Sequence, residues 1–512
     1  ASFIDPNMLQ AVELVRGPAS TAYGSGNIGG LLRSLPQTGP RSELRFGWGG
    51  SGNENNQLLR LGGELGYLAL SRRAADNAET PDGEPLHTEH EQYNLLLGGA
   101  QQTDAARYEL VALLADGSDI GKSNSRYPDQ RVTSYPEERH WLTQLSRVTE
   151  RSLTAVFAHS QELETRVLRP GERRDEVNSS SLDFGARYVH GTPGDVGWRW
   201  GVDYLGRRDV DNDEQRFPSG EQPEGKRAAL RGEQDELAGF VERQWAWHTL
   251  EASGGVRLGK QWQDARGWSS QEDELFSAYL GANWQLADAW AVTGELSRGA
   301  RIANLSEKFF SGTTGRGQVI GNPQLDAESA ISVDLGVIHT AARSRQELHI
   351  YRVELDDFIE RIALDPDTLS YSNLGGGHIT GVEFSAGWSL GSNLSLLLNG
   401  HWQEGEDGDR APLQDVSPNR MGVALDYRGA DWQWTLDYNH RFSKSDVAST
   451  EQEVGSADLL SFDLRRELSP SFAISLWGRN LLNERYLLTT DDLSTEAEKI
   501  SFGLQVSWRS PP

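Results

Sequence analysis

Apolar and polar side chains alternate along most of the chain from residue 42 onward, in runs of about ten residues. In residues 276–286, one face carries Phe, Ala, Leu, Ala, Trp and Leu, and the other carries Ser, Tyr, Gly, Asn and Gln. The same two-faced pattern occurs in residues 432–439 and in the last run, 499–508. Alternation with a period of two predicts β-strands. An apolar face opposite a polar face is typical of a transmembrane β-barrel wall.

The alternating runs predict an all-β fold, an antiparallel transmembrane β-barrel of about 22 strands, and an even number is expected of a single-chain bacterial barrel. The predicted strands lie at residues 42–51, 56–64, 67–75, 90–102, 107–116, 139–147, 152–167, 179–190, 197–209, 234–245, 249–261, 275–286, 290–302, 329–340, 346–360, 370–390, 394–406, 419–428, 432–444, 457–467, 472–486 and 499–508.

The connections between these strands alternate in length, as outer-membrane barrels require of their short periplasmic turns and long outer loops. Short links lie at 65–66, 103–106, 150–151, 287–289 and 429–431. Long links lie between them, at 76–89, 117–138, 210–233, 303–328 and 487–498. A β-propeller also has alternating strands, but the repeat of four-stranded blades is not visible. The loop pattern therefore favours an outer-membrane barrel.

The composition narrows the class of protein. Only 37% of the residues are hydrophobic, and no stretch approaches the roughly 18 consecutive apolar residues that a membrane-spanning helix needs. Cysteine is absent, which excludes disulfides, thiolate metal sites and cysteine nucleophiles. The 55 glycines and 16 tryptophans suit close strand packing and aromatic side chains at membrane interfaces. No signal peptide opens the chain, so we expect a mature or trimmed form.

The formal net charge of −26 bears on the partners. A polyanionic protein repels nucleic acid, so we expect no nucleic-acid partner. Cationic ligands are better partners, as are divalent ions that bridge acidic loops to lipopolysaccharide. The alternative, that the acidity only keeps a large protein soluble, stays open.

The most specific segment is Val12-Glu13-Leu14-Val15-Arg16-Gly17-Pro18-Ala19-Ser20-Thr21-Ala22-Tyr23-Gly24-Ser25-Gly26-Asn27-Ile28-Gly29-Gly30. It reads as a strand, a turn at Gly17-Pro18, a helical turn and a glycine-rich reversal into a second strand. This segment resembles the end of the plug domain of TonB-dependent outer-membrane receptors. The resemblance implies that Glu13 and Arg16 form the charged pair that family plugs place against the inner barrel wall.

Two further segments resemble the same family. Residues 476–486 (LWGRNLLNERY) resemble its penultimate strand, and residues 371–375 with 380–383 (YSNLG and TGVE) resemble another strand motif. The resemblance implies that residues 1–40 are the C-terminal remnant of a plug and that residues 41–512 are the barrel. A complete plug of the family begins well before Val12 and carries a TonB box. We expect the remainder to have been removed, omitted or carried by another polypeptide.

The resemblance implies active uptake across the outer membrane of a Gram-negative bacterium. A scarce small-molecule metal complex, with an iron chelate of the siderophore type as first choice, would bind the outer loops, and the TonB complex would pull on the plug. Haem, another metal complex and cobalamin are alternative substrates within the family. A passive porin is an alternative class, but a porin has no use for the plug segment.

The long loop 303–328 is the best guide to the ligand. Its segments 305–310 and 321–325 resemble the two boxes that flank the haem-ligating histidine of haem receptors. No histidine occurs between Arg301 and His339, so this loop offers no axial ligand to haem, and an iron chelate is the favoured ligand. Charge and stacking by this loop would hold an anionic, partly aromatic chelate; the candidate residues are Lys308, Phe309, Phe310, Arg316 and Asn322. The alternative is that these residues only fold the loop.

Three other features suggest chemistry. His87, Glu89 and His90 could bind a transition metal or haem, or they could be solvated loop residues. The acidic runs 209–214 and 404–409 could hold calcium, although no EF-hand spacing is present. Gly24, Gly26 and Gly29 match a dinucleotide fingerprint, but they lead into a strand rather than a helix.

Catalysis is unsupported, because the chain has neither a nucleophile elbow nor a zinc-protease motif. An outer-membrane barrel enzyme would need clustered His, Asp and Ser residues in the loops. We therefore expect a protein that is not an enzyme and requires no cofactor.

Overall fold

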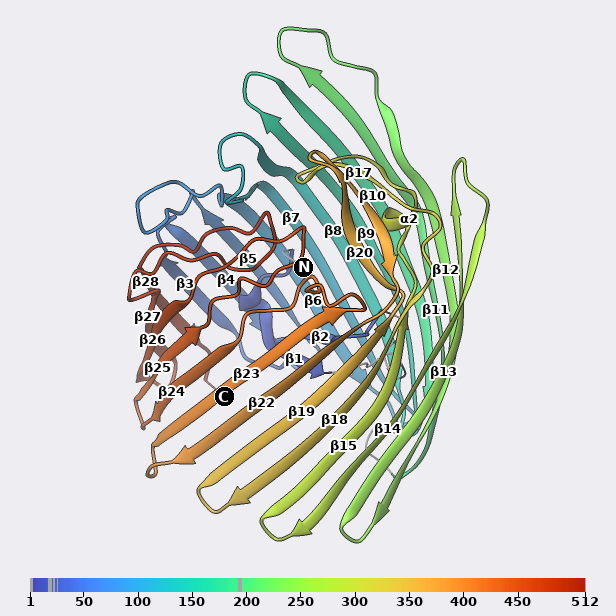
Figure 1. Ribbon diagram of the computed structural model, residues 1–512. Coiled ribbons are helices and arrows are strands. Elements are labelled where there is room, and N and C mark those ends of the chain that lie inside the picture. The colour runs from blue at the N-terminus through green and yellow to red at the C-terminus, as the bar shows by residue number, and fades with distance from the viewer. Residues whose placement is uncertain (1–2, 17–20, 22–23, 25, 192–195, 512) are drawn as a thin grey trace.

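The computed structural model describes residues 3–511 except 17–20, 22–23, 25 and 192–195. Its main body is a closed barrel of 22 strands, in which each strand is antiparallel to its neighbours and β28 pairs with β3 to complete the wall. The long loops gather at the upper end of the barrel in Figure 1, and the short turns lie at its lower end. The predicted fold class and strand number are confirmed.

The barrel strands follow one another in chain order around the wall. They are β3 Glu43–Gly49, β4 Glu54–Gly62, β5 Gly66–Ala75, β6 His90–Gln102, β7 Arg107–Lys122, β8 Val132–Val148, β9 Ser152–Arg169, β10 Arg173–His190, β11 Gly197–Pro218, β12 Arg227–Trp247, β13 Leu250–Ala265, β14 Gln271–Ala287, β15 Trp290–Arg301, β18 Glu328–Ala341, β19 Ser344–Asp356, β22 Gly377–Ser389, β23 Leu394–Asp407, β24 Arg420–Arg428, β25 Trp432–Arg441, β26 Ala457–Ser469, β27 Phe472–Arg479 and β28 Ser501–Arg509.

Each predicted strand corresponds to one barrel strand, but several outer ends were predicted too short. The predicted loop 210–233 is mostly strand, because β11 continues to Pro218 and β12 already begins at Arg227. These extensions carry polar side chains on both faces, so they lack the alternation that lipid imposes. Cross-strand ion pairs stabilise these extensions, as between Arg231 and Asp211 at 2.9 Å.

Two predicted strands are divided in the structure. Residues 370–390 form β21 and β22, and residues 346–360 form β19 and the start of β20. The second break lies at Asp357, whose φ of 51° is left-handed and interrupts an extended chain. Both breaks lie where the alternation is interrupted, at Asp356-Asp357 and at Gly375-Gly376-Gly377, and the prediction joined the runs on either side.

Apolar side chains cover the outer face of the barrel. Phe276 and Leu280 of β14 and Leu335 of β18 are exposed, and their partners in the membrane are lipid chains. Trp247 and Trp284 are also exposed and lie near short turns, as expected for a belt of tryptophans at the membrane interface. This distribution fixes the height of the barrel in the membrane.

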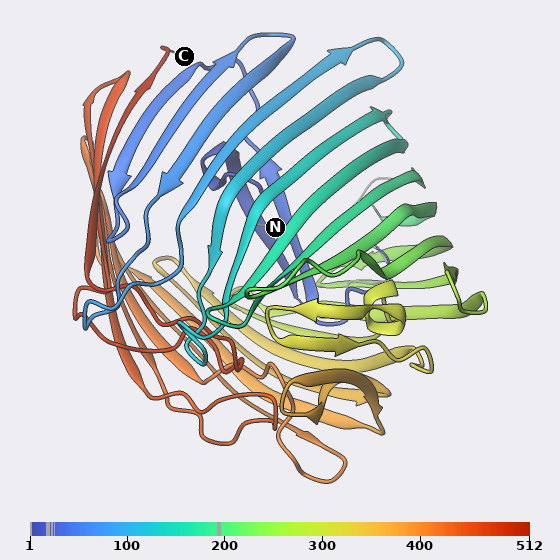
Figure 2. The ribbon, with the colours of Figure 1, turned by 90° about the horizontal axis from the view of Figure 1, so that it is seen from above.

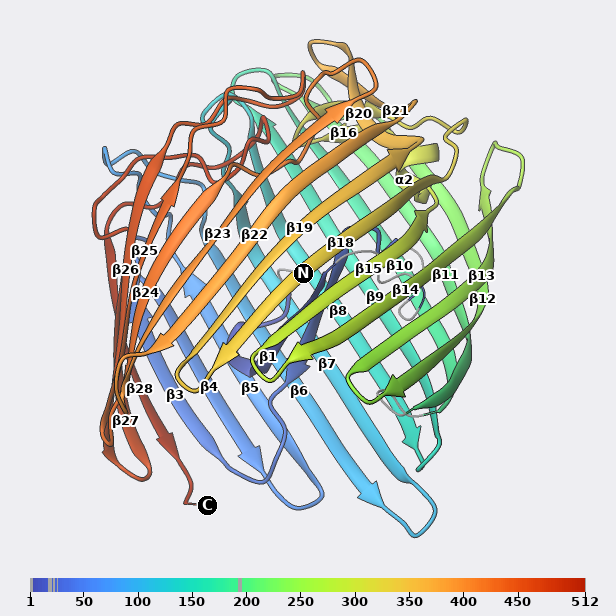
Figure 3. The same ribbon diagram turned by 60° about the horizontal axis from the view of Figure 1, so that its bottom comes forward.

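A two-stranded hairpin lies inside the barrel (Figure 2, Figure 3). It consists of β1 Leu9–Arg16 and β2 Gly30–Pro36, which pair in antiparallel register. The predicted strand and its return strand are confirmed; much of the glycine-rich segment between them lies outside the described residues. A short helix, η1 Pro6–Met8, precedes the hairpin and is capped by Asp5. Among the described residues, no helix is long and apolar enough to cross a membrane.

The hairpin is fixed to one side of the inner wall. Met8 packs into an apolar cluster with four luminal side chains, Leu58, Ala69, Leu96 and Leu113. The following segment is held by Arg60, which is 2% exposed and donates to the carbonyl oxygens of Gln37, Gly39 and Arg41. One buried guanidinium therefore binds three carbonyls of the connection between hairpin and barrel.

Candidate functional site

A small sheet lies over the mouth of the barrel. It combines two loops in the order β16 Ser311–Thr314, β17 Gly317–Ile320, β21 Thr368–Leu374 and β20 Phe358–Asp365. β17 and β21 are parallel, whereas the other pairs are antiparallel. The helix α2 Leu305–Phe309 precedes this sheet and begins at a capping box between Asn304 and Glu307.

The sheet is held by a hydrophobic core that it shares with the inner wall. Leu305, Phe309, Phe310 and Val319 pack against side chains of the outer ends of three barrel strands, namely Val210, Ala229, Leu230 and Ala265. Leu369 and Tyr371 cover the same cluster. Burial of so many apolar side chains gives this outer sheet a fixed position over the lumen.

A chamber of about 530 Å³ lies between the sheet and the inner wall. Its wall side comes from β7 to β11, and its other side comes from α2, the outer sheet and the last loop. The residues that line it are Lys122, Ser123, Asn124, Thr133, Tyr135, Thr165, Val177, Ser179, Asn212, Ser306, Phe310, Thr313, Thr314, Gly315, Arg316, Val319, Arg361, Tyr371 and Leu493. Hydroxyl groups and cations dominate this surface, and its described lining includes no carboxylate.

The three cations of the chamber differ in their partners. Arg316 is bound to Asp491 and Asp492, and Arg361 lies 3.7 Å from Asp491. Lys122 makes no ion pair with the described residues, and its Nζ lies 4.4 Å from the centre of the Tyr135 ring. The Tyr135 ring attracts this cation through its π face.

The side chains of Tyr135 and Tyr371 bring two phenol hydroxyl groups to the chamber. Burial raises the pKa of the Tyr371 hydroxyl, which therefore stays protonated and able to donate at neutral pH. The chamber thus offers donors and positive charge to a guest and matches an anionic molecule that carries oxygen acceptors.

Family comparisons agree with this architecture. Residues 29–481 match the family model described as TonB dependent receptor-like, beta-barrel, and residues 1–31 match the TonB-dependent Receptor Plug Domain. The chain belongs to the TonB-dependent receptor family. This receptor is an outer-membrane protein, and members of its family are transporters rather than enzymes.

Solved structures share the fold at low sequence identity. The copper transporter OprC superimposes with a TM-score of 0.85 at 14% identity, over 99% of this chain and 87% of that one. The ferric citrate transporter FecA gives a TM-score of 0.79 at 15% identity, over 99% and 85%. The ferric yersiniabactin uptake receptor FyuA from Yersinia pestis gives 0.76 at 16%, over 98% and 85%.

The structure separates the five predicted ligand residues of this receptor. Phe310 and Arg316 line the chamber. Lys308 is 2% exposed and is bound to Asp273 at 2.9 Å, and Phe309 lies in the hydrophobic core. Asn322 donates to the backbone oxygen of Tyr371 at 3.0 Å. The last three residues fold the loop, as in the alternative interpretation.

The three predicted metal ligands are not brought together. His87 Nε2 lies 4.0 Å from Asp129, whereas His90 Nδ1 lies 3.2 Å from the backbone oxygen of Thr88. Glu89 lies between them in the chain, yet no group of three or more metal-binding side chains forms anywhere in the described part of the chain. The local backbone points the two imidazoles at different partners.

The acidic runs are likewise engaged elsewhere. Residues 209–214 lie within β11, where successive side chains point to opposite faces, so the carboxylates of this run do not all face the same side of the strand. Asp213 is bound to Arg231 at 2.5 Å, and Glu214 to Arg227 at 2.5 Å. In the run 404–409, the Asp407 carboxylate accepts the backbone N–H groups of Asp409 and Ala411. Calcium at these runs stays a prediction.

The plug pair is described only in part. Glu13 is bound to Arg33 of the neighbouring plug strand at 3.0 Å, and both side chains are exposed. The Arg16 side chain lies outside the described residues. The predicted contact of this pair with the barrel wall therefore stays a prediction.

Sequence reasoning missed most chamber residues, among them Lys122, Tyr135, Arg361 and Tyr371. Lys122 and Tyr135 fall in the predicted loop 117–138, but they belong to the outer extensions of β7 and β8. Arg361 was assigned to a link, and Tyr371 to a family motif. Their convergence depends on the tilt of the barrel and on loop packing, which no local pattern encodes.

Proposed function

We propose that this receptor takes up an anionic iron chelate of the siderophore type, with energy from the TonB complex. The observation that carries the proposal is the chamber, whose described lining combines three cations with many hydroxyl groups in a protein of net charge −26. A negatively charged chelate with oxygen donors complements such a surface. The plug hairpin inside the lumen argues against a passive porin.

Lys122 is the side chain on which the proposal depends most. Arg316 and Arg361 are already close to Asp491, so much of their charge is balanced. Lys122 has the Tyr135 ring as a close contact, and the Glu138 carboxylate acts on its charge without forming an ion pair with it. A chelate that enters the chamber would gain a new ion pair at Lys122 without breaking an existing one.

The test compares Lys122→Met with Lys226→Met, which removes an exposed lysine from the β11–β12 loop. Uptake of radiolabelled iron would be measured at limiting concentrations with two probes, ferric citrate and a ferric catecholate. We expect Lys122→Met to lower uptake of the cognate chelate at least tenfold while Lys226→Met has no effect. Both variants should retain the heat-modifiable migration of a folded barrel. Unchanged uptake by folded Lys122→Met would remove the chamber from the substrate path.

A growth test with haem as the iron source examines the alternative substrate. If haem supports growth and the double change His87→Ala with His90→Ala abolishes that growth, the first long loop is the substrate site instead. Cobalamin uptake, measured in the same strains, tests the other alternative substrate.

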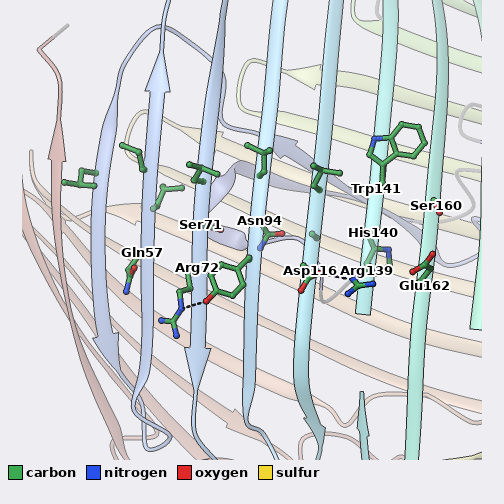
Figure 4. Close-up of a pocket in the computed structure, with 18 of the residues that line it drawn as sticks. Gln57, Ser71, Arg72, Asn94, Asp116, Arg139, His140, Trp141, Ser160 and Glu162 are labelled. Carbon is green, nitrogen blue, oxygen red and sulfur yellow. Dashed lines mark hydrogen bonds and ion pairs between the residues drawn. The ribbon is translucent and has the colours of Figure 1, made fainter. Parts of the chain in front are cut away.

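The proposed lipid partner is lipopolysaccharide, and the observation that supports it is a groove of about 780 Å³ on the outer face of β3 to β9. Its floor is apolar and includes the exposed side chains of Phe46, Leu70 and Leu114. Figure 4 shows a row of polar side chains across neighbouring strands of the groove: Gln57, Arg72, Asp116, Arg139 and Glu162. An acyl chain fits the floor, and the phosphorylated sugars fit the row, directly or through divalent ions.

Arg72→Glu combined with Arg139→Glu should reduce the lipopolysaccharide that stays bound in native mass spectrometry. Phosphatidylglycerol retention should change little. Equal loss of both lipids would mean that the row recognises negative charge in general.

A further inference from the structure

Two histidines are in direct contact on the inner wall of the barrel. His140 Nδ1 on β8 lies 3.0 Å from His159 Nε2 on β9, and the two rings are parallel within 4°. The outer nitrogens face carboxylates. His140 Nε2 lies 3.1 Å from Glu138, and His159 Nδ1 lies 3.7 Å from Asp183. The His140 side chain is 3% exposed, so these contacts are largely shielded from water.

The number of protons on this pair follows from its neighbours. The outer nitrogens face carboxylates, Glu138 through a hydrogen bond and Asp183 at an ion-pair distance of 3.7 Å, and this favours a proton on both. One of the inner nitrogens must carry a proton to donate to the other. The pair then holds one proton more than two neutral imidazoles and bears a single positive charge. Arg207 keeps Asp183 ionised through hydrogen bonds of 2.6 and 2.9 Å.

Phe3 of the plug segment stacks on this charged pair. Its ring centre lies 3.9 Å from that of His140 and 5.8 Å from that of His159, with interplanar angles of 18° and 19°. Ile4 and Met8 of the same segment pack on the apolar luminal cluster beside the pair. The contact between Phe3 and a charged imidazole adds cation–π attraction to this packing.

We propose that the His140–His159 pair is a pH-sensitive attachment point that holds plug residues 3–8 on the barrel wall. A second added proton would set two N–H groups against each other at the 3.0 Å inner contact. Loss of the shared proton would remove the imidazole N–H group that faces one of the two carboxylates. The attachment is therefore strongest when the pair holds a single charge.

Other charged groups surround the pair. Lys122 of β7 and Tyr135 of β8 act on Glu138 from the outer side, and Asp5 lies on the plug segment itself. The register partner of His140 on β7 is Ala115, which carries no charge.

The pH dependence follows from proton counting. Released histidines each titrate near about pH 6.5, so below that value release takes up a proton, and above it release gives one up. Attachment should therefore be maximal near about pH 6.5 and should weaken on the order of twentyfold at two pH units to either side.

Thiol labelling tests the attachment, because the chain has no cysteine. Met8→Cys places a single thiol on the attached segment, where Met8 is 2% exposed, and Gln10→Cys places one at an exposed position of β1 as the reference. The receptor in detergent is labelled with a methanethiosulfonate reagent at pH 4.5, 6.5 and 8.5. The ratio of the two rates removes the intrinsic pH dependence of thiol reactivity. We expect the ratio to be lowest at pH 6.5.

His159→Gln provides the decisive variant. A glutamine can accept from His140 Nδ1–H and donate toward Asp183 without titrating, so the rise in acid should disappear while the rise in alkali remains. The matched control is His349→Gln, because luminal His349 pairs with Asp334 at 2.9 Å but has no second histidine as partner among the residues that the structure describes. This control should keep both rises.

Three outcomes would overturn the proposal. The first is a labelling ratio that does not depend on pH, and the second is a rise in acid that persists in His159→Gln. The third is a ratio near one at pH 6.5 both for Met8→Cys and for Ile4→Cys, a second thiol on the same segment, because the segment would then not be attached.

Discussion

Arg316 and Asp491 are joined by two hydrogen bonds of 2.9 and 2.7 Å, although 175 positions separate them in the chain. Arg316 lies in the turn between β16 and β17, and Asp491 lies in the last long loop. Asp492 adds a third bond, at 2.7 Å. This contact ties the outer sheet to the loop that faces it across the chamber, so Arg316 both lines the chamber and closes its wall.

Arg316→Ala should loosen the last loop. Loss of a partly buried ion pair with several hydrogen bonds is expected to destabilise the closed loop by about 2–3 kcal/mol. Hydrogen exchange of residues 487–498 should become faster, and uptake of the cognate chelate should fall while the barrel still assembles. Arg428→Ala serves as the control, since its ion pair with Asp426 involves a side chain that is 75% exposed and should contribute little. Unaltered exchange in Arg316→Ala would show that other contacts hold the loop.

The same pair should make the loop sensitive to acid. Burial alone would raise the pKa of the Asp491 carboxyl, but its hydrogen bonds with Arg316 and the Arg316 charge outweigh burial, so the pKa lies below its ordinary value of 3.8. A depressed pKa stabilises the closed loop above pH 3.8, and this contribution is lost as the pH falls through the lower, folded value. Exchange of residues 487–498, corrected for intrinsic rates, should accelerate in that range. Asp491→Asn should abolish the acceleration.

Lys308 should be needed for the fold of its loop rather than for contact with a ligand. Its ammonium is buried and bound to Asp273, so Lys308→Ala leaves a carboxylate without its partner and should cost roughly 3 kcal/mol. Limited proteolysis within residues 303–327 would reveal the loosened loop. Lys308→Ala with Asp273→Ala should recover much of the protection. If uptake fails while proteolysis stays normal, Lys308 contacts the substrate after all.

Arg60 should control the connection between plug and barrel. Arg60→Lys keeps the charge but cannot bind three carbonyl oxygens with one planar group, and the loss should be about 2–4 kcal/mol of local stability. Backbone amides of residues 37–41 should exchange faster as a result. Arg107→Lys, at a side chain that is 56% exposed, is the matched control. Equal exchange in the two variants would contradict this role.

Several features of the receptor could be predicted from the sequence because their cause is local. In the membrane, each strand must alternate between lipid and lumen, so the pattern at 276–286 identifies β14 without knowledge of its neighbours. The same reasoning gave 22 strands and the alternation of loop lengths. The two plug strands on either side of the glycine-rich segment were also predicted from the sequence, because turn signals act over a few positions.

The sequence by itself determined the barrel and its topology in the membrane, because lipid exposure imposes a period of two on every membrane-spanning strand. It determined the family through the resemblance of residues 12–30 to the plug motif. Only the tertiary structure decided how polar residues are used. Lys308 and Arg316 are both cations of the same loop. Lys308 is buried against Asp273 and supports the loop, whereas Arg316 faces the chamber. The contact between His140 and His159 likewise depends on the register of β8 and β9 and on the position of Phe3. Such contacts join residues far apart in the chain, and their geometry is set by barrel tilt and loop packing rather than by local pattern.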